Sequence, residues 1–183
     1  MAERNIREVK SVLHRRCILF PVLLPFLLGA AAPAAAADKV IGLFNDWGAQ
    51  TFSEGRNTGC SMWSQPTKDE GDYTQRGPIY AYVTHRPWDK RLNEVSITAG
   101  YAYKKDSAVQ IRIGGEKFAL FTDGETAWSR SPADDKKLVD AMRRGSSMIV
   151  SGMSSRGTQT TDTYSLSGFT KAYEAIGKAC NVK

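Results

Sequence analysis

Short runs in which hydrophobic and polar residues alternate recur along most of this chain, and they constrain its fold more than any other feature. The clearest runs are residues 109–113 and 117–122, which flank Gly114-Gly115. Alternation with a period of two places the hydrophobic side chains on one face of a β-strand. Two glycines between such runs are typical of a two-residue hairpin turn whose twist matches the strands it joins. The pattern therefore predicts a β-hairpin around Gly114-Gly115.

Similar runs, each ended by turn residues, predict further strands along the chain. They cover residues 39–44, 49–53, 59–64, 80–84, 94–99, 126–129 and 147–153. Two polar segments, residues 66–78 and 154–162, are expected to be solvated loops. Many short strands with frequent turns and few helices are typical of a mainly β fold, here a β-sandwich decorated by helices. The sequence contains neither an internal repeat nor a linker that would divide this domain.

One internal segment carries the signals of an α-helix. Ser131 can cap its first turn, and Pro132 suits the first helical position. Leu138 and Met142 are four residues apart, so they share one face of the helix. Gly145 is expected to end it.

The segment from Thr163 to Cys180 is expected to close the core. Residues 163–167 alternate as a last strand. Gly168 then tolerates backbone angles that other residues resist. Hydrophobic residues recur at helical spacing over residues 170–179, which predicts a short C-terminal helix.

The N-terminal residues resemble a secretory signal peptide. Basic residues precede an apolar run over residues 17–28, and an alanine-rich stretch ends at Ala37. The run of 12 residues is shorter than the roughly 20 needed to span a bilayer. We therefore expect a signal peptide over residues 1–37, cleavage between Ala37 and Asp38, and one domain over residues 38–183. An uncleaved N-terminal anchor and export by the twin-arginine route, through Arg15-Arg16, are the alternatives.

The charge of the chain does not favour a nucleic-acid partner. The formal net charge of +6 falls to +3 when the five basic and two acidic residues of the expected leader are removed. Nucleic-acid binding domains usually carry a concentrated basic surface.

Two of the three cysteines lie in the expected exported domain. Cys17 lies in the leader, which leaves Cys60 and Cys180. An even pair in an exported domain predicts a disulfide. Two buried free thiols are the alternative. Two cysteines and one histidine, His85, are too few for a metal site unless carboxylates join them, so no metal and no cofactor are expected.

The sequence does not show the residues of a familiar catalytic site. A Ser-His-Asp or Cys-His site needs a histidine, and His85 lies in a short cationic stretch. The acidic residues lie in turns and at the expected helix start, where solvation or capping explains them. We therefore expect a non-enzymatic protein. A hydrolase that uses paired carboxylates and a carrier of small molecules or lipids are the alternatives.

Two segments could form a binding surface. Arg86, Trp88, Lys90 and Arg91 combine cationic and aromatic side chains, which suits an anionic glycan, a lipid headgroup or an acidic protein surface. In the alternative reading, this segment is a solvated turn with its tryptophan packed under the sheet edge.

The second segment, residues 154–162, offers hydroxyl groups together with Arg156 and Asp162. Its alternative is a polar hairpin whose side chains bond their own backbone.

Several of these segments, taken in order, resemble a known family. Asp46-Trp47, Cys60, the strand at residues 148–150 and residues 164–172 are similar to the invasion-associated locus B (IalB) family. The Ser-Leu-x-Gly-Phe ending is the most specific motif. These are exported proteins of alphaproteobacteria, and the resemblance covers nearly all of the expected exported domain. Many members carry a cysteine four residues after the early tryptophan, and Thr51 occupies that position here, which places the chain in a shorter branch.

The resemblance implies an immunoglobulin-like β-sandwich in the periplasm, associated with the outer membrane or secreted. It also implies a role in host-cell invasion in some pathogens, and it offers no catalytic residues to transfer. The expected partner is a protein, a glycan or another envelope component, and not a nucleic acid, with peripheral membrane association as a further alternative.

Overall fold

The computed structural model describes residues 38–182 of the 183-residue chain. The expected signal peptide, residues 1–37, and its cleavage position at Ala37 lie outside the described residues and stay predictions. Within the described residues, no helix is long and apolar enough to cross a membrane.

Eleven strands in residues 38–182 form one antiparallel sheet, so the predicted mainly β fold is confirmed. Their order in the sheet is β1-β2-β3-β5-β6-β9-β8-β7-β10-β11-β4. Their bounds are β1 (Lys39–Phe44), β2 (Trp47–Glu54), β3 (Asn57–Ser64), β4 (Lys68–Gly71), β5 (Tyr80–Arg86), β6 (Arg91–Thr98), β7 (Ala108–Ile113), β8 (Glu116–Asp123), β9 (Thr126–Trp128), β10 (Ser147–Met153) and β11 (Gln159–Ser165).

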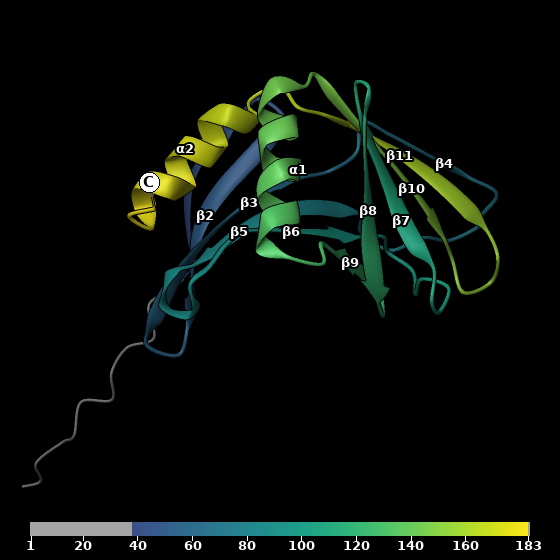
Figure 1. Ribbon diagram of the computed structural model, residues 1–183, viewed down its shortest axis with the longest axis horizontal. Helices are drawn as coiled ribbons and strands as arrows, with labels where there is room; N and C mark the ends of the chain where they lie inside the picture. Colours follow the sequence, from purple (N-terminus) through teal and green to yellow (C-terminus); the bar gives the residue numbers. More distant parts are fainter. Residues whose placement is uncertain (1–37, 183) are drawn as a thin grey trace, which may run out of the picture. The chain divides into compact units, whose positions relative to one another are not determined.

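The sandwich takes the form of one continuous, strongly bent sheet (Figure 1). Helix α1 (Pro132–Arg144) packs against β6, and helix α2 (Phe169–Ala179) packs against β1, β2 and β3. A short 3₁₀ helix, η1 (Pro87–Asp89), joins β5 to β6. Both α-helices cover the face of the sheet that carries the buried side chains, which we call the inner face.

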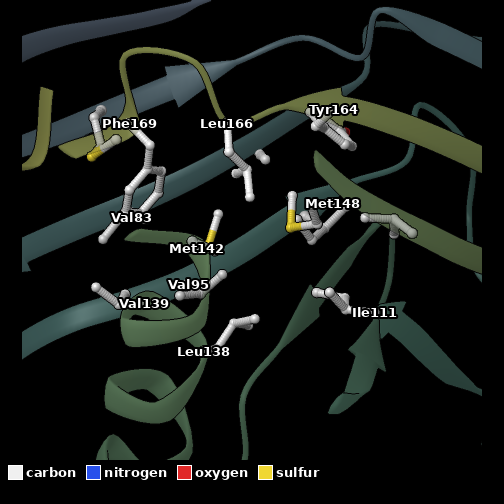
Figure 2. Close-up of a cluster of buried hydrophobic side chains, with 14 of the residues drawn as sticks. Val83, Val95, Ile111, Leu138, Val139, Met142, Met148, Tyr164, Leu166 and Phe169 are labelled. Atoms are coloured by element: carbon white, nitrogen blue, oxygen red, sulfur yellow. The ribbon is translucent and has the colours of Figure 1, made fainter. Parts of the chain in front are cut away.

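The inner face, α1 and the closing segment meet in a hydrophobic core (Figure 2). Each side chain labelled there is at most 5% exposed: Val83, Val95, Ile111, Leu138, Val139, Met142, Met148, Tyr164, Leu166 and Phe169. The alternating pattern explains this packing, because the buried residues of each strand are two positions apart.

The predicted hairpin and the predicted internal helix are both present. Ile113 pairs with Glu116 across Gly114-Gly115, which makes a two-residue turn. The hydroxyl of Ser131 caps α1 by accepting the backbone N–H of Asp134 at 3.2 Å.

The closing segment turns from β11 into α2 at Gly168. This residue has φ +89°, and a Cβ there would overlap the carbonyl oxygen of Phe44. Trp47 packs edge-on against Phe169 at 4.9 Å between ring centroids, and its indole N–H donates to the carbonyl of Ser165 at 3.0 Å. The early tryptophan and the late Gly-Phe motif therefore form one contact.

The predicted disulfide is present and fastens α2 to the sheet. Cys60 on β3 and Cys180 at the end of α2 are bonded across 120 residues of chain. The disulfide therefore closes the end of the domain where α2 lies, which we call the helical end.

Both segments expected to be solvated loops contain strands. Lys68–Gly71 forms β4, which pairs with β11 at the edge of the sheet. Strand β11 begins at Gln159, four residues before the expected start. Its pairing with β4 on one side and β10 on the other explains the difference, because the backbone of residues 159–162 gains ladder hydrogen bonds that a loop would lack.

Candidate functional site

A buried ion pair lies at the end of the domain where β4, β10 and β11 meet. The guanidinium of Arg76 donates two hydrogen bonds to the carboxylate of Asp162, at 2.6 and 2.7 Å. The two side chains are only 4% and 3% exposed. Arg76 also donates through Nε to the carbonyl of Ala99 at 2.7 Å. The connection between β4 and β5 is therefore attached to the inner face of β11.

Tyrosine rings surround this ion pair. The guanidinium carbon of Arg76 lies 5.5 Å from the ring centroid of Tyr73 and 5.0 Å from that of Tyr101. Tyr73 donates its hydroxyl hydrogen bond to Asp69, and the hydroxyls of Tyr101 and Thr160 are 2.6 Å apart. These contacts stack a cation between two aromatic faces, an arrangement that favours guanidinium over ammonium.

Burial and pairing act in opposite directions on the two charges. Burial lowers the pKa of Arg76, but the hydrogen bonds and charge of Asp162 outweigh it and hold that pKa above its ordinary value. Burial raises the pKa of Asp162, while the hydrogen bonds and charge of Arg76 oppose the rise. The pair is a structural clamp, because each charge is satisfied by the other in a water-poor setting.

An open pocket lies beside this clamp. Its volume is about 650 Å³, and its lining comes from residues 72–77, residues 100–102 and the turn between β10 and β11. That size falls in the usual range for small-molecule sites. The lining is rich in hydroxyl and amide side chains, with the Tyr73 and Tyr101 rings as its aromatic part.

Besides Arg76, two charged side chains of opposite sign line the same pocket. Asp72 and Arg156 are both exposed lining residues. No ion pair within residues 38–182 involves either of them. Both charges are therefore available to a ligand.

The segment expected to form a cationic surface is neutralised by nearby acids. Arg86 pairs with Glu54 and with Glu94, and Arg91 pairs with Glu94 at 3.3 Å. Arg91 also contacts Asp89 at 3.2 Å.

The aromatic part of this segment packs inward along the sheet surface. Trp88 is half-buried edge-on against Phe52, at 6.5 Å between centroids, and Arg86 stacks on the same ring at 5.6 Å. Lys90 is exposed and has a left-handed backbone with φ +57°. The structure thus brings Arg86, Trp88 and Arg91 into one packed, charge-balanced cluster.

Arg156 and Asp162, which the sequence places in one polar loop, lie in different environments. Arg156 is exposed at the pocket, as a surface residue should be. Asp162 is 2% exposed and holds Arg76, so it is not a surface residue. The reason is strand alternation, because Thr160, Asp162 and Tyr164 all face inward on β11.

The opposite, outer face of the sheet carries a row of aromatic side chains. Register pairs connect Leu43, Gly48, Trp63, Tyr82, Ser96, Trp128 and Phe121 across seven neighbouring strands. At about 4.8 Å per strand, this row is roughly 30 Å long. We call it the outer row.

The outer row includes some of the most exposed hydrophobic residues of the domain. Leu43 is 75% exposed and Phe121 is 37% exposed. The indole of Trp63 lies flat on Gly48, since a Cβ at that glycine would overlap the ring. The Trp63 ring is thus laid along the sheet surface.

Two buried titratable groups outside the pocket, His85 and Asp135, bond the backbone of β6. His85 is fully buried, and its Nδ1 accepts the backbone N–H of Asn93 at 3.0 Å. Asp135 on α1 accepts the backbone N–H of Val95 at 2.9 Å, which ties the helix to β6. Burial raises the pKa of Asp135 and lowers the pKa of His85 to about 4.

The described residues offer no ready metal centre. Among residues 38–182, no group of three or more histidine, cysteine, aspartate or glutamate side chains is placed to hold a metal ion. The pocket supports hydrogen bonding and stacking, and the outer row supports apolar contact.

Comparison with known proteins identifies the family. Residues 47–177 match the family model for the invasion associated locus B (IalB) protein. The chain belongs to the IalB family. The matched span runs from Trp47 through the Gly-Phe motif to Gly177, so it includes both partners of the Trp47–Phe169 contact.

A solved structure supports the fold of this IalB-family chain. The crystal structure of invasion associated protein B from Bartonella henselae matches with a TM-score of 0.55 at 14% sequence identity. The match covers 76% of this chain and 96% of that chain. At this identity the likeness concerns the fold. No curated protein sequence matches the chain.

Sequence reasoning missed the clamp and the outer row. Arg76 lies in a polar stretch that reads as a loop, and nothing in its local sequence indicates burial. The outer row had a weak signal, since Tyr80 and Tyr82 are aromatic on the face opposite Ala81 and Val83. Hydrophobic residues on both faces of a strand indicate that neither face is purely solvated.

Proposed function

We propose that this IalB-family chain is an exported, non-catalytic binding protein of the cell envelope. The observation that carries the proposal is the disulfide between Cys60 and Cys180, which closes 120 residues of chain. Disulfides persist in oxidising compartments such as the periplasm. The leader-like residues 1–37 add independent support, because their composition matches a secretory signal.

A binding role fits the titratable groups better than catalysis does. Asp162, Asp135 and His85 are the buried acid and imidazole groups with shifted pKa, and each is engaged in holding the fold. A hydrolase with two carboxylates needs a pair that faces a substrate. A lipid carrier needs an apolar cavity. The pocket beside the Arg76–Asp162 clamp, which we call the end pocket, has a largely polar lining.

The outer row supports a role in contact with another surface. Exposed aromatic and aliphatic side chains that line up across several strands are typical of interaction faces. We propose that this face binds an envelope or host-cell component, in keeping with the invasion role for which the family is named. Peripheral association with the outer membrane is part of the same proposal.

The compartment is tested by the mass of the protein recovered from the envelope of its native host. We expect a chain that begins at Asp38 and takes up alkylating label at two cysteines only after reduction. A chain that keeps its leader, or that takes up label without reduction, would contradict export to an oxidising compartment.

The interaction role is tested with a deletion strain complemented by variants. Leu43→Ser and Phe121→Ser remove exposed hydrophobic side chains of the outer row and leave the core intact. We expect both to reduce host-cell entry below that of the wild-type complement. Val40→Ser is the matched control, because Val40 is 60% exposed on the same strand outside the row. Equal entry for all four strains would refute the role of this face.

A further inference from the structure

The end pocket is built from three segments held in fixed positions. Arg76 is clamped to Asp162, and the neighbouring backbone N–H of Gly77 donates to the carbonyl of Gly100 at 2.8 Å. Gly100 has φ +71°, and a Cβ there would overlap the backbone of Gly77. The first two walls therefore touch through their glycines.

The third wall, the turn between β10 and β11, is fixed as well. The hydroxyl of Ser154 accepts the backbone N–H of Thr158 at 3.0 Å, and Ser155 donates its backbone N–H to the carbonyl of Ala102 at 2.8 Å. Tyr103 and Ser154 form an antiparallel bridge. A pocket whose walls are already ordered loses little conformational entropy when a ligand binds.

The side chains left over inside the pocket can both donate and accept hydrogen bonds. Thr74, Gln75, Ser155 and Thr158 line it, and no side-chain hydrogen bond within residues 38–182 occupies them. Hydroxyl and amide groups complement a ligand that itself carries many hydroxyls. The tyrosine rings beside them offer flat apolar surface to the C–H face of such a ligand.

The charges of the pocket balance. Asp72 and Arg156 contribute one negative and one positive side chain, and the clamp beneath them is neutral as a pair. A site for an anion or a cation usually carries an excess of the opposite charge. Balanced charge, hydroxyl-rich walls and two aromatic rings favour a ligand that is polar and uncharged.

We propose that this pocket binds a short, uncharged saccharide. A volume of about 650 Å³ can accommodate an oligosaccharide of a few units. The pocket is lined by segments next to β4, β10 and β11, and these strands lie at the opposite end of the domain from α2 (Figure 1). The proposal does not depend on export or on the outer row.

The first test is a titration of the purified, ¹⁵N-labelled protein followed by amide chemical shifts. The probes are maltotriose, cellotriose and triacetylchitotriose, with citrate and glycylglycine as the anionic and zwitterionic comparisons. We expect at least one trisaccharide to give saturable shifts centred on residues 72–77, 100–102 and 154–158. We expect its affinity to stay constant from about 50 mM to about 500 mM NaCl, because an uncharged ligand is not screened.

Variants then assign the binding to the pocket. Gln75→Ala removes an exposed lining amide and should weaken saccharide binding about tenfold, the effect of losing one or two hydrogen bonds. Gln159→Ala is the matched control, since Gln159 is exposed on the adjoining strand outside the lining. Both variants should melt at the wild-type temperature.

Several results would overturn the proposal. Absence of saturable shifts with all three trisaccharides would do so. Chemical-shift changes centred on Trp63 and Tyr82 would show that the glycan binds the outer row and not the pocket. If citrate bound in a salt-sensitive way and the saccharides did not bind, the ligand would be an anion. If glycylglycine bound and the saccharides did not, the ligand would be a zwitterion. Equal saccharide affinity of the Gln75→Ala and Gln159→Ala variants would show that the pocket is not the binding site.

Discussion

His85 gives the sharpest stability prediction, because its imidazole must stay neutral in the folded protein. The side chain is 0% exposed on the inner face of β5. Its Nδ1 accepts the N–H of Asn93, so Nε2 carries the hydrogen, and that atom has no partner within residues 38–182. A second proton on Nδ1 would point at the N–H of Asn93 and would leave a positive charge in the core.

The size of the effect follows from the proton affinities of the two states. Burial lowers the pKa of His85 from 6.5 to about 4. Between these two pH values the unfolded chain binds a proton that the folded protein does not bind. The contribution of His85 to the free energy of unfolding is therefore at its full value above pH 6.5, and it falls as the pH is lowered to about 4. At about 1.4 kcal/mol per tenfold difference in proton affinity, the total loss is about 3 kcal/mol.

The assay is urea unfolding at several pH values from 4 to 7, with wild type and His85→Asn compared at each. The asparagine oxygen can accept the N–H of Asn93 but does not titrate. We expect the stability difference between the two proteins to narrow by about 3 kcal/mol as the pH falls across this range. Carboxylates titrate in both proteins, so their contributions cancel.

Tyr173→Phe is the control for local damage. Tyr173 packs edge-on against His85 at 5.7 Å and donates to the side chain of Asn93 at 2.6 Å, so the variant disturbs the same site and keeps the imidazole. It should retain the full pH dependence of the wild type. A difference between wild type and His85→Asn that stays constant with pH would refute the reasoning, as would an imidazole that titrates near its ordinary pKa.

Three further perturbations test how the domain is held together. Cys60→Ser should lower stability by up to about 4–5 kcal/mol without reductant and by little in reductant; equal melting temperatures without reductant would exclude the disulfide. Leu166→Ala should cost about 2–5 kcal/mol in urea unfolding, because the side chain is 5% exposed, and a loss under about 0.5 kcal/mol would place it outside the core. Asp162→Asn should lower the free energy of unfolding by about 3–5 kcal/mol, because it leaves the charge of Arg76 buried and unpaired. The double variant Arg76→Met with Asp162→Leu removes both charges and should be more stable than Asp162→Asn. A double variant less stable than Asp162→Asn would contradict this account of the clamp.

The features that sequence predicted well depend on residues close together in the chain. The hairpin at Gly114-Gly115 needs only its own alternation and two glycines. Helix α1 begins at its predicted cap, Ser131, since a capping hydroxyl and the N–H that it accepts are three residues apart. The disulfide is a long-range contact, but Cys60 and Cys180 were the only cysteines left after the leader was set aside.

The features that sequence missed depend on which strands become neighbours. Strand β4 is exposed and charged, and it forms because β11 offers an unpaired edge. Arg76 is buried because β4 carries the chain across the end of the sheet, where Asp162 faces inward. The outer row exists because seven strands share one register. Neither neighbour order nor register can be read from periodicity alone.

The two ends of the domain are closed by different means, and this difference bears on where a ligand can enter. The end near α2 is closed by a disulfide and by apolar packing such as the Trp47–Phe169 contact. The other end is closed by the Arg76–Asp162 pair, whose hydrogen bonds demand a polar surrounding of hydroxyls and tyrosines. Because the charges of Arg76 and Asp162 satisfy each other, this pair can border an open pocket without exposing the apolar core. The residues that complete the fold at this end therefore also leave space for a hydrated ligand. This is why the clamp end, and not the helical end, is where we place the saccharide.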